Sequence, residues 1–289
     1  MMLRWLVSNW LRNTAQEKVK ETLAGVARKQ LDSVGEEEAA PPPPREIGII
    51  FALGIEAGGT VDVLQERVTT RFQTHVEHAG LLNGRYVVIA ESGVGREAAA
   101  DTTRAMLSLH RPKWIVSAGF AGSLHEDLRR GHILMANEVA DSDNNLLSME
   151  LNVDEETVAS TRALHIGRLL TVDRLIRTKM EKEQLAEEHA ALGCDMETFA
   201  VVEACQQAKT ICMSVRVVSD GLEDELPREI EQLLGQTTLA AKLGAAAGAI
   251  FQRPSSVKDM WKLKEDAIKA SDRLARFLTG VIAQLPEEA

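Results

Sequence analysis

The chain is poor in aromatic residues and in positive charge, and both shortages limit what it can bind. Phe, Trp and Tyr make up 4% of the 289 residues, so a platform for stacking nucleic acid bases is not expected. Acidic residues outnumber basic ones by 43 to 33, which gives a formal net charge of −10. A surface that binds nucleic acid needs a basic face, because it displaces the counterions around phosphates. We therefore expect no nucleic acid partner.

Cysteine is scarce as well. Cys194, Cys205 and Cys212 lie in or beside apolar stretches and form no C-x-x-C pair. An odd number of cysteines without paired spacing predicts reduced core thiols in a cytoplasmic protein rather than a disulfide framework. The seven histidines are scattered without metal-ligand spacing. We expect neither a metal nor another cofactor.

The N-terminal region has no apolar run long enough to span a bilayer, and it has no signal-peptide cleavage pattern. Leu, Val and Trp recur at helical spacing among Lys and Arg, which predicts a basic amphipathic helix over residues 1–35. This helix either packs on protein or rests on a membrane surface through residues 1–31, with Trp5 and Trp10 at the interface. The expected location is the cytoplasm, with peripheral attachment to the inner face of the membrane as the alternative.

The domain organisation follows from composition. Residues 36–45 form a Glu/Pro-rich linker, because the prolines at 41–44 cannot join the interior of a helix or sheet. Residues 46–253 are predicted to form the main α/β domain. Residues 254–289 are predicted to form a C-terminal helical extension dominated by one long helix.

Within the main domain, short apolar runs alternate with amphipathic or charged stretches. Ile47–Leu53 and Tyr86–Ala90 are continuous apolar runs, typical of strands buried on both faces. Asn83-Gly84 is a hairpin signal, and a helix is expected around Val61–Glu66. The alternation predicts an α/β fold: a three-layer α/β/α sandwich around an open, mixed, mostly parallel sheet, with the N-terminal amphipathic helix and C-terminal helices added.

Three carboxylates stand at the ends of predicted elements. Glu56 follows the first strand, Glu197 begins a helix, and Asp220 follows the strand Ile211–Val218. Ligands of open α/β sheets bind beyond the carboxyl ends of the strands, so these residues are candidates for a site. Simpler explanations remain open: Glu56 and Glu197 can complement helix dipoles, and Asp220 can cap a turn.

Small residues also follow two strands. Gly93 and Gly95 open a helix, where backbone amides could hold an anion or a polar ligand. The next strand ends in Ser117, Ala118 and Gly119 without the acid that a dinucleotide fold requires, which disfavours a nicotinamide cofactor. We predict that Gly93, Ser117, Ala118 and Gly119 contribute to a substrate site, because small residues let the main chain approach a ligand. Tight packing between strand and helix is the other explanation.

Two arginines are candidates for holding an anion. Arg216 lies inside an apolar strand, and a buried arginine needs a carboxylate or an anion nearby. Arg96 follows the glycine turn and can equally face solvent.

Five motifs occur in an order that resembles one known family. They are Ile47–Glu56, Ser92–Gly95, Ser117–Gly119, Asp195–Glu197 and Arg216–Asp220. Together they cover roughly residues 47–225 and resemble the nucleoside phosphorylase/nucleosidase superfamily, most closely its methylthioadenosine/adenosylhomocysteine nucleosidase branch. Thr171–Arg174 is also similar to the hopanoid-associated phosphorylase-like branch, which acts on a lipid-linked adenosyl compound.

The resemblance implies a role for each matching residue. Asp220 would protonate the purine at N7, and Ser219 would help to place it. Glu197 would bind the ribose hydroxyls, Met196 would pack under the sugar, and Glu56 would activate the attacking water.

Four more residues would complete the site. Ser117 and Arg216 would line the water or anion pocket, and Leu175 and Ile176 would contact the base. Leu175 stands where the nucleosidase branch usually has an aromatic residue, so it keeps an apolar contact but no ring face. A homo-oligomer, either a dimer or a hexamer, is implied in the same way.

The predicted function is hydrolysis of the N-glycosidic bond of an adenine nucleoside of the methylthioadenosine/adenosylhomocysteine type, without a cofactor. A carboxylic acid can donate the proton that the leaving purine needs, and carboxylates can stabilise an oxocarbenium-like sugar. Glu56 beside the nucleophile favours water over phosphate by like-charge repulsion. The alternatives are a purine nucleoside phosphorylase, with a lipid-linked adenosyl compound as one candidate substrate, and a catalytically inactive binding protein of the same fold.

Overall fold

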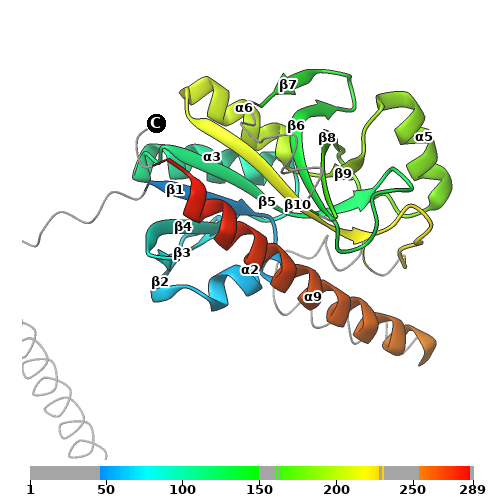
Figure 1. The fold of residues 1–289 in the computed structure, drawn as a ribbon, viewed down its shortest axis with the longest axis horizontal. Helices are drawn as coiled ribbons and strands as arrows, with labels where there is room; N and C mark the ends of the chain where they lie inside the picture. Colours follow the sequence, from blue (N-terminus) through cyan, green and yellow to red (C-terminus); the bar gives the residue numbers. More distant parts are fainter. Residues whose placement is uncertain (1–45, 150–160, 162, 228–229, 231–253, 287–289) are drawn as a thin grey trace, which may run out of the picture. The chain divides into compact units, whose positions relative to one another are not determined.

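The structure is a computed structural model that describes residues 46–149, 161, 163–227, 230 and 254–286 (Figure 1). The predicted N-terminal helix and the linker therefore lie outside the described residues, as does much of the segment before the C-terminal helix. The domain limits given above remain predictions.

Ten strands form one mixed sheet in the part of the chain that is described. They are β1 (Ile47–Phe51), β2 (Gln65–Arg71), β3 (Val76–Leu82), β4 (Arg85–Glu91), β5 (Trp114–Ser123), β6 (Ile133–Asp141), β7 (Leu146–Ser148), β8 (Leu164–Thr171), β9 (Gly193–Asp195) and β10 (Ile211–Asp220). The described helices are α2 (Gly54–Asp62), α3 (Arg96–His110), α5 (Lys179–His189), α6 (Thr198–Ala208) and α9 (Pro254–Gln284). The predicted α/β class and the β3–β4 hairpin at Asn83-Gly84 are confirmed.

The sheet closes on itself over half of its width, which corrects the expectation of an open sheet. The strand order is β10-β6-β8-β9-β5-β1-β4-β3-β2, and β10 also pairs with β5. Strands β5, β10, β6, β8 and β9 therefore form a ring, whereas β1, β4, β3 and β2 extend from β5 as an open sheet. Closure is possible because β5 is ten residues long: it pairs with β1 and β10, and its last residues pair with β9.

Parallel pairings do not predominate, contrary to the sequence prediction. Five of the described strand pairs are parallel and five are antiparallel. Apolar runs identify buried strands, but they carry no information on which strands become neighbours.

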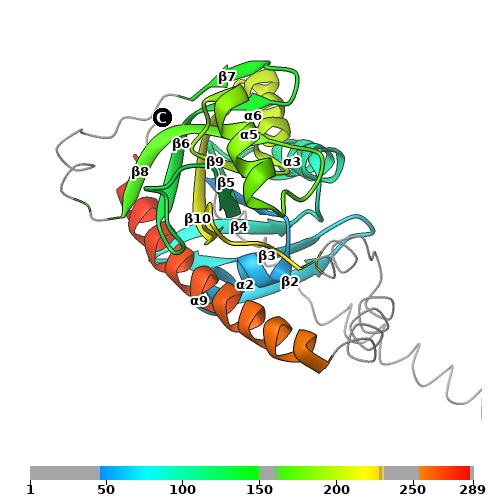
Figure 2. The same ribbon diagram turned by 90° about the vertical axis from the view of Figure 1, so that its right-hand side faces the viewer.

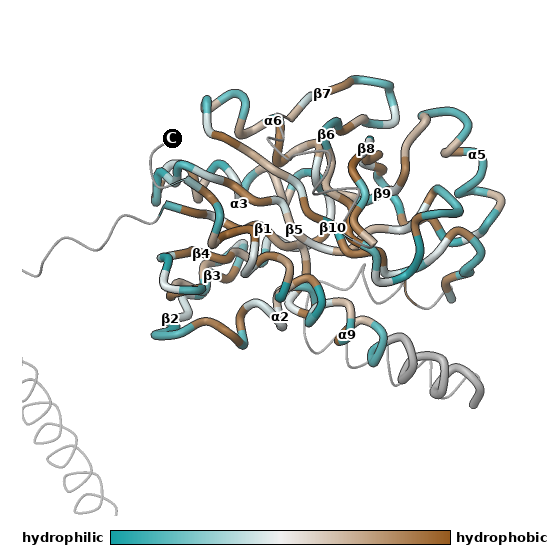
Figure 3. The backbone as a smooth tube through the Cα atoms, viewed as in Figure 1, coloured by the Kyte–Doolittle hydropathy of each residue, from teal (hydrophilic) through white to brown (hydrophobic). Residues whose placement is uncertain are grey.

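Helices cover both faces of the sheet, and each face has its own apolar core. Alternate residues of one strand point to opposite faces. On β1, Ile49 packs with the core shared by α2 and α9, while Ile50 packs with the core shared by α3 and α6. Figure 2 shows α9 on one side of the strands and α3 and α6 on the other, and Figure 3 shows the hydrophobic stretches concentrated on the strands. None of the described helices is long and apolar enough to cross a membrane.

The first helix begins earlier than predicted. It spans Gly54–Asp62, and β2 begins where the helix around Val61–Glu66 was expected to continue. The early start of α2 was not predicted because the helix contains two glycines in its interior, and glycine is a weak helix former. Gly59 is explained by α9: an added β-carbon there would lie 2.8 Å from the carbonyl oxygen of Ser271, so only glycine permits this close contact.

Candidate active site

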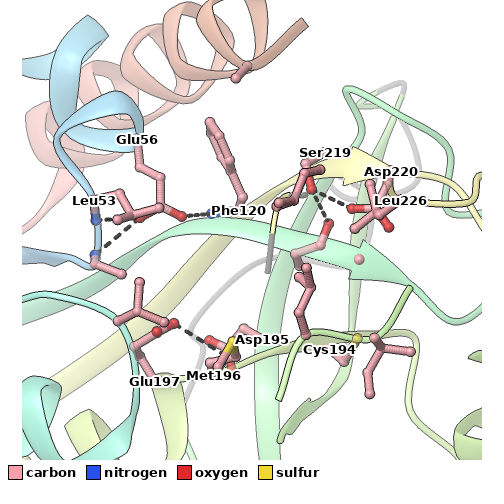
Figure 4. A pocket seen from close by; sticks show the side chains of 18 of the residues that line it. Leu53, Glu56, Phe120, Cys194, Asp195, Met196, Glu197, Ser219, Asp220 and Leu226 are labelled. Carbon is pink, nitrogen blue, oxygen red and sulfur yellow. Dashed lines mark hydrogen bonds between the residues drawn. The ribbon is translucent and has the colours of Figure 1, made fainter. Parts of the chain in front are cut away.

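A cavity of about 580 Å³ opens at the carboxyl ends of four ring strands, β5, β8, β9 and β10. This is the position where α/β sheets bind ligands. Seven of the residues predicted from the sequence line it: Glu56, Leu175, Ile176, Met196, Glu197, Ser219 and Asp220. In Figure 4, Glu56 and Glu197 lie toward one end of the cavity, and Ser219 and Asp220 lie toward the other. The three carboxylates expected to converge therefore share one cavity.

Glu56 is held by backbone amides at the start of α2. Its Oε2 accepts hydrogen bonds from the N–H groups of Leu53 (2.9 Å) and Ala52 (3.1 Å), and its Oε1 accepts one from Phe120 (2.9 Å). Burial raises the pKa of Glu56, although these hydrogen bonds and the charge of Arg216 oppose that shift. The hydrogen bonds thus fix the orientation of the carboxylate, and the raised pKa makes it a stronger base than an exposed glutamate.

The small residues after Val116 leave room for the carboxylate of Glu56. The sequence predicted a turn at Ser117, Ala118 and Gly119, after a shorter strand. In the structure these residues lie inside β5. A β-carbon at Gly119 would lie 3.0 Å from Oε1 of Glu56, so glycine makes room for the carboxylate. Pairing with β10 explains why three small residues continue a strand instead of ending it, because Ala118 and Gly119 pair with β10 beyond the last pair of β5 with β1, at Ser117.

A second, small cavity of about 10 Å³ lies behind Glu56. Its lining includes Ser117, Ala118, Gly119 and Arg216, together with the carboxylate-bearing residues Glu56 and Glu197. Roughly 10–15 Å³ is the room that one buried water needs, and a water also needs several polar partners. The cavity therefore matches a single water molecule in both size and chemistry.

Arg216 has the buried carboxylate partner that its position predicted. Its Nε and Nη2 donate to Oδ2 of Asp195 at 3.0 and 2.8 Å, and Nη2 also donates to Oγ of Ser117 at 2.8 Å. Thr171 donates to the other oxygen of Asp195 at 2.7 Å, and Thr198 donates to Oδ2 through its backbone N–H at 3.1 Å. The sequence analysis placed Asp195 in a motif but gave it no role, because nothing local shows that it faces Arg216.

Glu197 lies at the start of α6, as expected, but its side chain makes no capping hydrogen bond to the helix. Its Oε1 accepts a hydrogen bond from the N–H of Gly95 at 2.8 Å. Burial, followed by the nearby charges of Asp195 and Glu56, raises the pKa of Glu197 to about 8. The carboxyl group therefore carries its proton at neutral pH and can donate a hydrogen bond to a ligand.

Of the two glycines in that turn, Gly95 contacts the site and Gly93 does not. Both have positive φ, +99° and +91°, which only glycine adopts without strain. Gly93 lines neither cavity, and its N–H donates to the carbonyl oxygen of Ala52 at 3.0 Å. The G-x-G spacing was thus a true signal of a special turn, and the predicted contribution of Gly93 to a substrate site stays a prediction.

The raised pKa of Glu197 predicts a stability effect. From the ordinary value of 4.5 up to about 8, the unfolded chain loses this proton while the folded protein keeps it, so stability falls as pH rises. The slope from this group is at most about 1.4 kcal/mol per pH unit. Glu197→Gln should therefore lose less stability between pH 5.5 and pH 8 than the wild type, as measured by urea unfolding. Equal losses in both proteins would contradict the buried, protonated state.

Asp220, the last residue of β10, has two different partners. Its Oδ1 accepts a hydrogen bond from Oγ of Ser219 at 2.6 Å. Its Oδ2 accepts one from Nζ of Lys182 at 2.6 Å, and the side chain of Lys182 is completely buried. Lys182 was not predicted as a site residue, because it is one of many charged residues in α5. Asp220 nevertheless keeps an opening, since it lines the large cavity.

Arg96 is not available for an anionic ligand. It pairs with Asp141 (3.4 Å) and Asp173 (3.1 Å) and donates to the carbonyl oxygen of Thr171 at 3.1 Å. Both candidate arginines are thus occupied by carboxylates of the protein itself. Among the residues that the structure describes, no group of three or more His, Cys, Asp or Glu side chains could hold a metal ion.

The fold belongs to a known class. A family profile described as Phosphorylase superfamily matches residues 46–253, so the chain belongs to that superfamily. The chain is similar to the 5′-methylthioadenosine/S-adenosylhomocysteine nucleosidase of Haemophilus influenzae strain PittEE, with 27% identity over 225 residues, 70% of this chain and 96% of the relative. The corresponding protein of Staphylococcus haemolyticus is 26% identical, over 66% of this chain and 92% of its own.

Solved structures show the same fold. The Helicobacter pylori nucleosidase with 5′-methylthioadenosine in its active site superimposes with a TM-score of 0.65 at 19% identity, covering 83% of this chain and 99% of that one. Native futalosine hydrolase of the same species gives a TM-score of 0.64 at 19% identity, covering 84% and 99%.

Proposed function

We propose that this protein is a purine nucleosidase that hydrolyses the N-glycosidic bond of an adenine nucleoside, of the methylthioadenosine/adenosylhomocysteine type. The observation that carries the proposal is the meeting of Glu56, Glu197 and Asp220 at one cavity, with a water-sized cavity beside Glu56. The similarity to curated nucleosidases supports the same reaction class. An inactive binding protein would not need this arrangement of acids.

The proposed reaction assigns one step to each end of the cavity. At one end, the O–H bond of protonated Asp220 breaks and an N–H bond forms at N7 of the purine, so the electron pair of the glycosidic bond leaves with a neutral base. At the other end, Glu197 binds the ribose hydroxyls. A water in the small cavity attacks the anomeric carbon, and Glu56 accepts its proton. The carboxylate of Glu56 also stabilises the positive charge that develops on the sugar.

Water is a better nucleophile for this site than phosphate. A phosphate dianion needs cationic ligands, and Arg216 and Arg96 are already paired with Asp195 and with Asp141 and Asp173. The small cavity of about 10 Å³ has room for about one water. Charge repulsion from Glu56 would add to these obstacles. Hydrolysis is therefore favoured over the phosphorylase alternative.

The test is adenine release in phosphate-free buffer. Methylthioadenosine, adenosylhomocysteine and futalosine are supplied separately, and the free base and the sugar product are separated by chromatography. We expect adenine and free sugar from an adenine nucleoside at a rate that added phosphate does not raise. Release that occurs only with phosphate and yields a sugar 1-phosphate would make the protein a phosphorylase. No release from any nucleoside would support a binding protein.

The finer parts of the expectation remain proposals. The lipid-linked substrate and the membrane contact depend on residues 1–35, which lie outside the described residues. The homo-oligomer rests on resemblance to the family, and the three-layer sandwich rests on the alternation of strands and helices in the sequence.

A further inference from the structure

Lys182 is a fully buried ammonium group directly behind the proposed proton donor. It lies in α5, and its side chain has no exposed surface. Lysine is almost never fully buried unless it is paired. Nζ donates to Oδ2 of Asp220 at 2.6 Å, to the carbonyl oxygen of Gly221 at 2.7 Å and to that of Asp224 at 3.0 Å. These bonds use all three of its N–H groups, and Lys182 does not line the cavity.

The contacts make the two oxygens of Asp220 unequal. Oδ2 is occupied by Lys182, so Oδ1 is the oxygen left for exchange with a ligand. Oγ of Ser219 lies 2.6 Å from Oδ1 and 3.3 Å from the carbonyl oxygen of Ala121. A hydroxyl has a single proton to donate. Ser219 can thus donate to an ionised Asp220 and turn to Ala121 when Oδ1 itself carries the proton.

We propose that Lys182 is a positioning residue that holds Asp220 by Oδ2, presents Oδ1 to the purine and stabilises the carboxylate left after proton transfer. This inference rests on the proposed function of the site. In the transfer, the Oδ1–H bond breaks, the N7–H bond forms, and the electron pair stays on Oδ1. The resulting anion then lies against a cation that has no competing water, where a charge-assisted hydrogen bond is strong.

The same ammonium group ties the acid to the cavity wall. By binding the carbonyl oxygens of Gly221 and Asp224, Lys182 fixes the loop that carries Leu226 into the lining of the cavity. Arg130 holds this loop from the other side, through the carboxylate of Asp224 at 2.9 Å. Lys182 therefore contacts both Asp220 and the loop that helps to line the cavity.

The test compares Lys182→Gln with a matched control on the same helix. Lys179→Gln removes a half-exposed lysine that pairs with Glu223 of the same loop at 2.6 Å but does not touch Asp220. We expect Lys182→Gln to lower kcat for adenine release about 10²-fold with a much smaller change in KM. Lys179→Gln should match the wild type.

A merely structural lysine would lower the amount of folded protein without lowering kcat per folded site, and an unchanged kcat per folded site would overturn the proposal. A second variant tests whether Lys182 acts through Asp220. With Asp220→Asn already present, Lys182→Gln should cause no further loss of kcat, and an equal loss in both backgrounds would also overturn it.

The activity of the wild type separates a failure of the proposed function from a failure of the role of Lys182. A wild type that releases no adenine overturns the proposed function, and the role of Lys182 with it, whereas an active wild type with an equally active Lys182→Gln overturns only the role of Lys182. If Lys182→Gln does not fold, lysine-labelled ¹⁵N NMR of the wild type replaces it. The protected ammonium signal of Lys182 should shift when adenine binds, and an unchanged signal would overturn the proposal.

Discussion

Glu56→Gln is expected to lower kcat for adenine release about 10³-fold, since the amide can no longer accept the proton of the attacking water. The Kd for adenine should change little, because the base lies at the Asp220 end of the cavity in the proposed reaction. The rate is measured by single-turnover adenine release, and binding is measured by calorimetry.

The substitution also tests the geometry around Glu56. Three backbone N–H groups, those of Ala52, Leu53 and Phe120, point at its two oxygens. Glutamine has only one side-chain oxygen, so its NH₂ group must face one of these N–H groups. We expect the free energy of unfolding to fall by about 1–3 kcal/mol. Glu203→Gln, on the exposed face of α6, is the control and should leave both rate and stability unchanged. Activity within tenfold of the wild type would remove Glu56 from the proposed mechanism.

Asp195→Ala is expected to destabilise the fold by about 3–5 kcal/mol, the largest stability effect we predict. Asp195 is the carboxylate partner of Arg216, and the exposed fraction of Arg216 is 2%. Removing the carboxylate leaves a buried guanidinium without its counter-charge and also leaves the hydroxyl of Thr171 without its acceptor. Urea unfolding with linear extrapolation measures the difference.

A double variant separates the pair from its surroundings. Asp195→Leu combined with Arg216→Met removes both charges, and replacing a buried ion pair by apolar groups often costs little. The double variant should therefore be more stable than Asp195→Leu alone, and the coupling is read from the double-mutant cycle. A cost below about 1 kcal/mol for Asp195→Ala would mean that Arg216 finds another partner or water.

Much of the site was predictable because its signals are local. A carboxylate at a strand-to-helix junction, as at Glu56, can be recognised from the residues on either side of it. The apolar strand around Arg216 requires a partner for the guanidinium, and the structure supplies one. These predictions depend on periodicity, helix ends and the high cost of burying an unpaired charge, all of which act within a few residues or through burial alone.

The closed strand ring, the choice of Asp195 as partner and the burial of Lys182 were decided only by tertiary structure. Lys182 and Asp220 are 38 residues apart, and α5 carries so many charges that no sequence pattern distinguishes the one pointing inward. The need for glycine at position 59 of α2 is explained only by the backbone of α9 that packs against it. Local sequence determined the apolar strands and the burial of their apolar residues, whereas the contacts between distant elements were set by which surfaces could pack together with every buried charge paired.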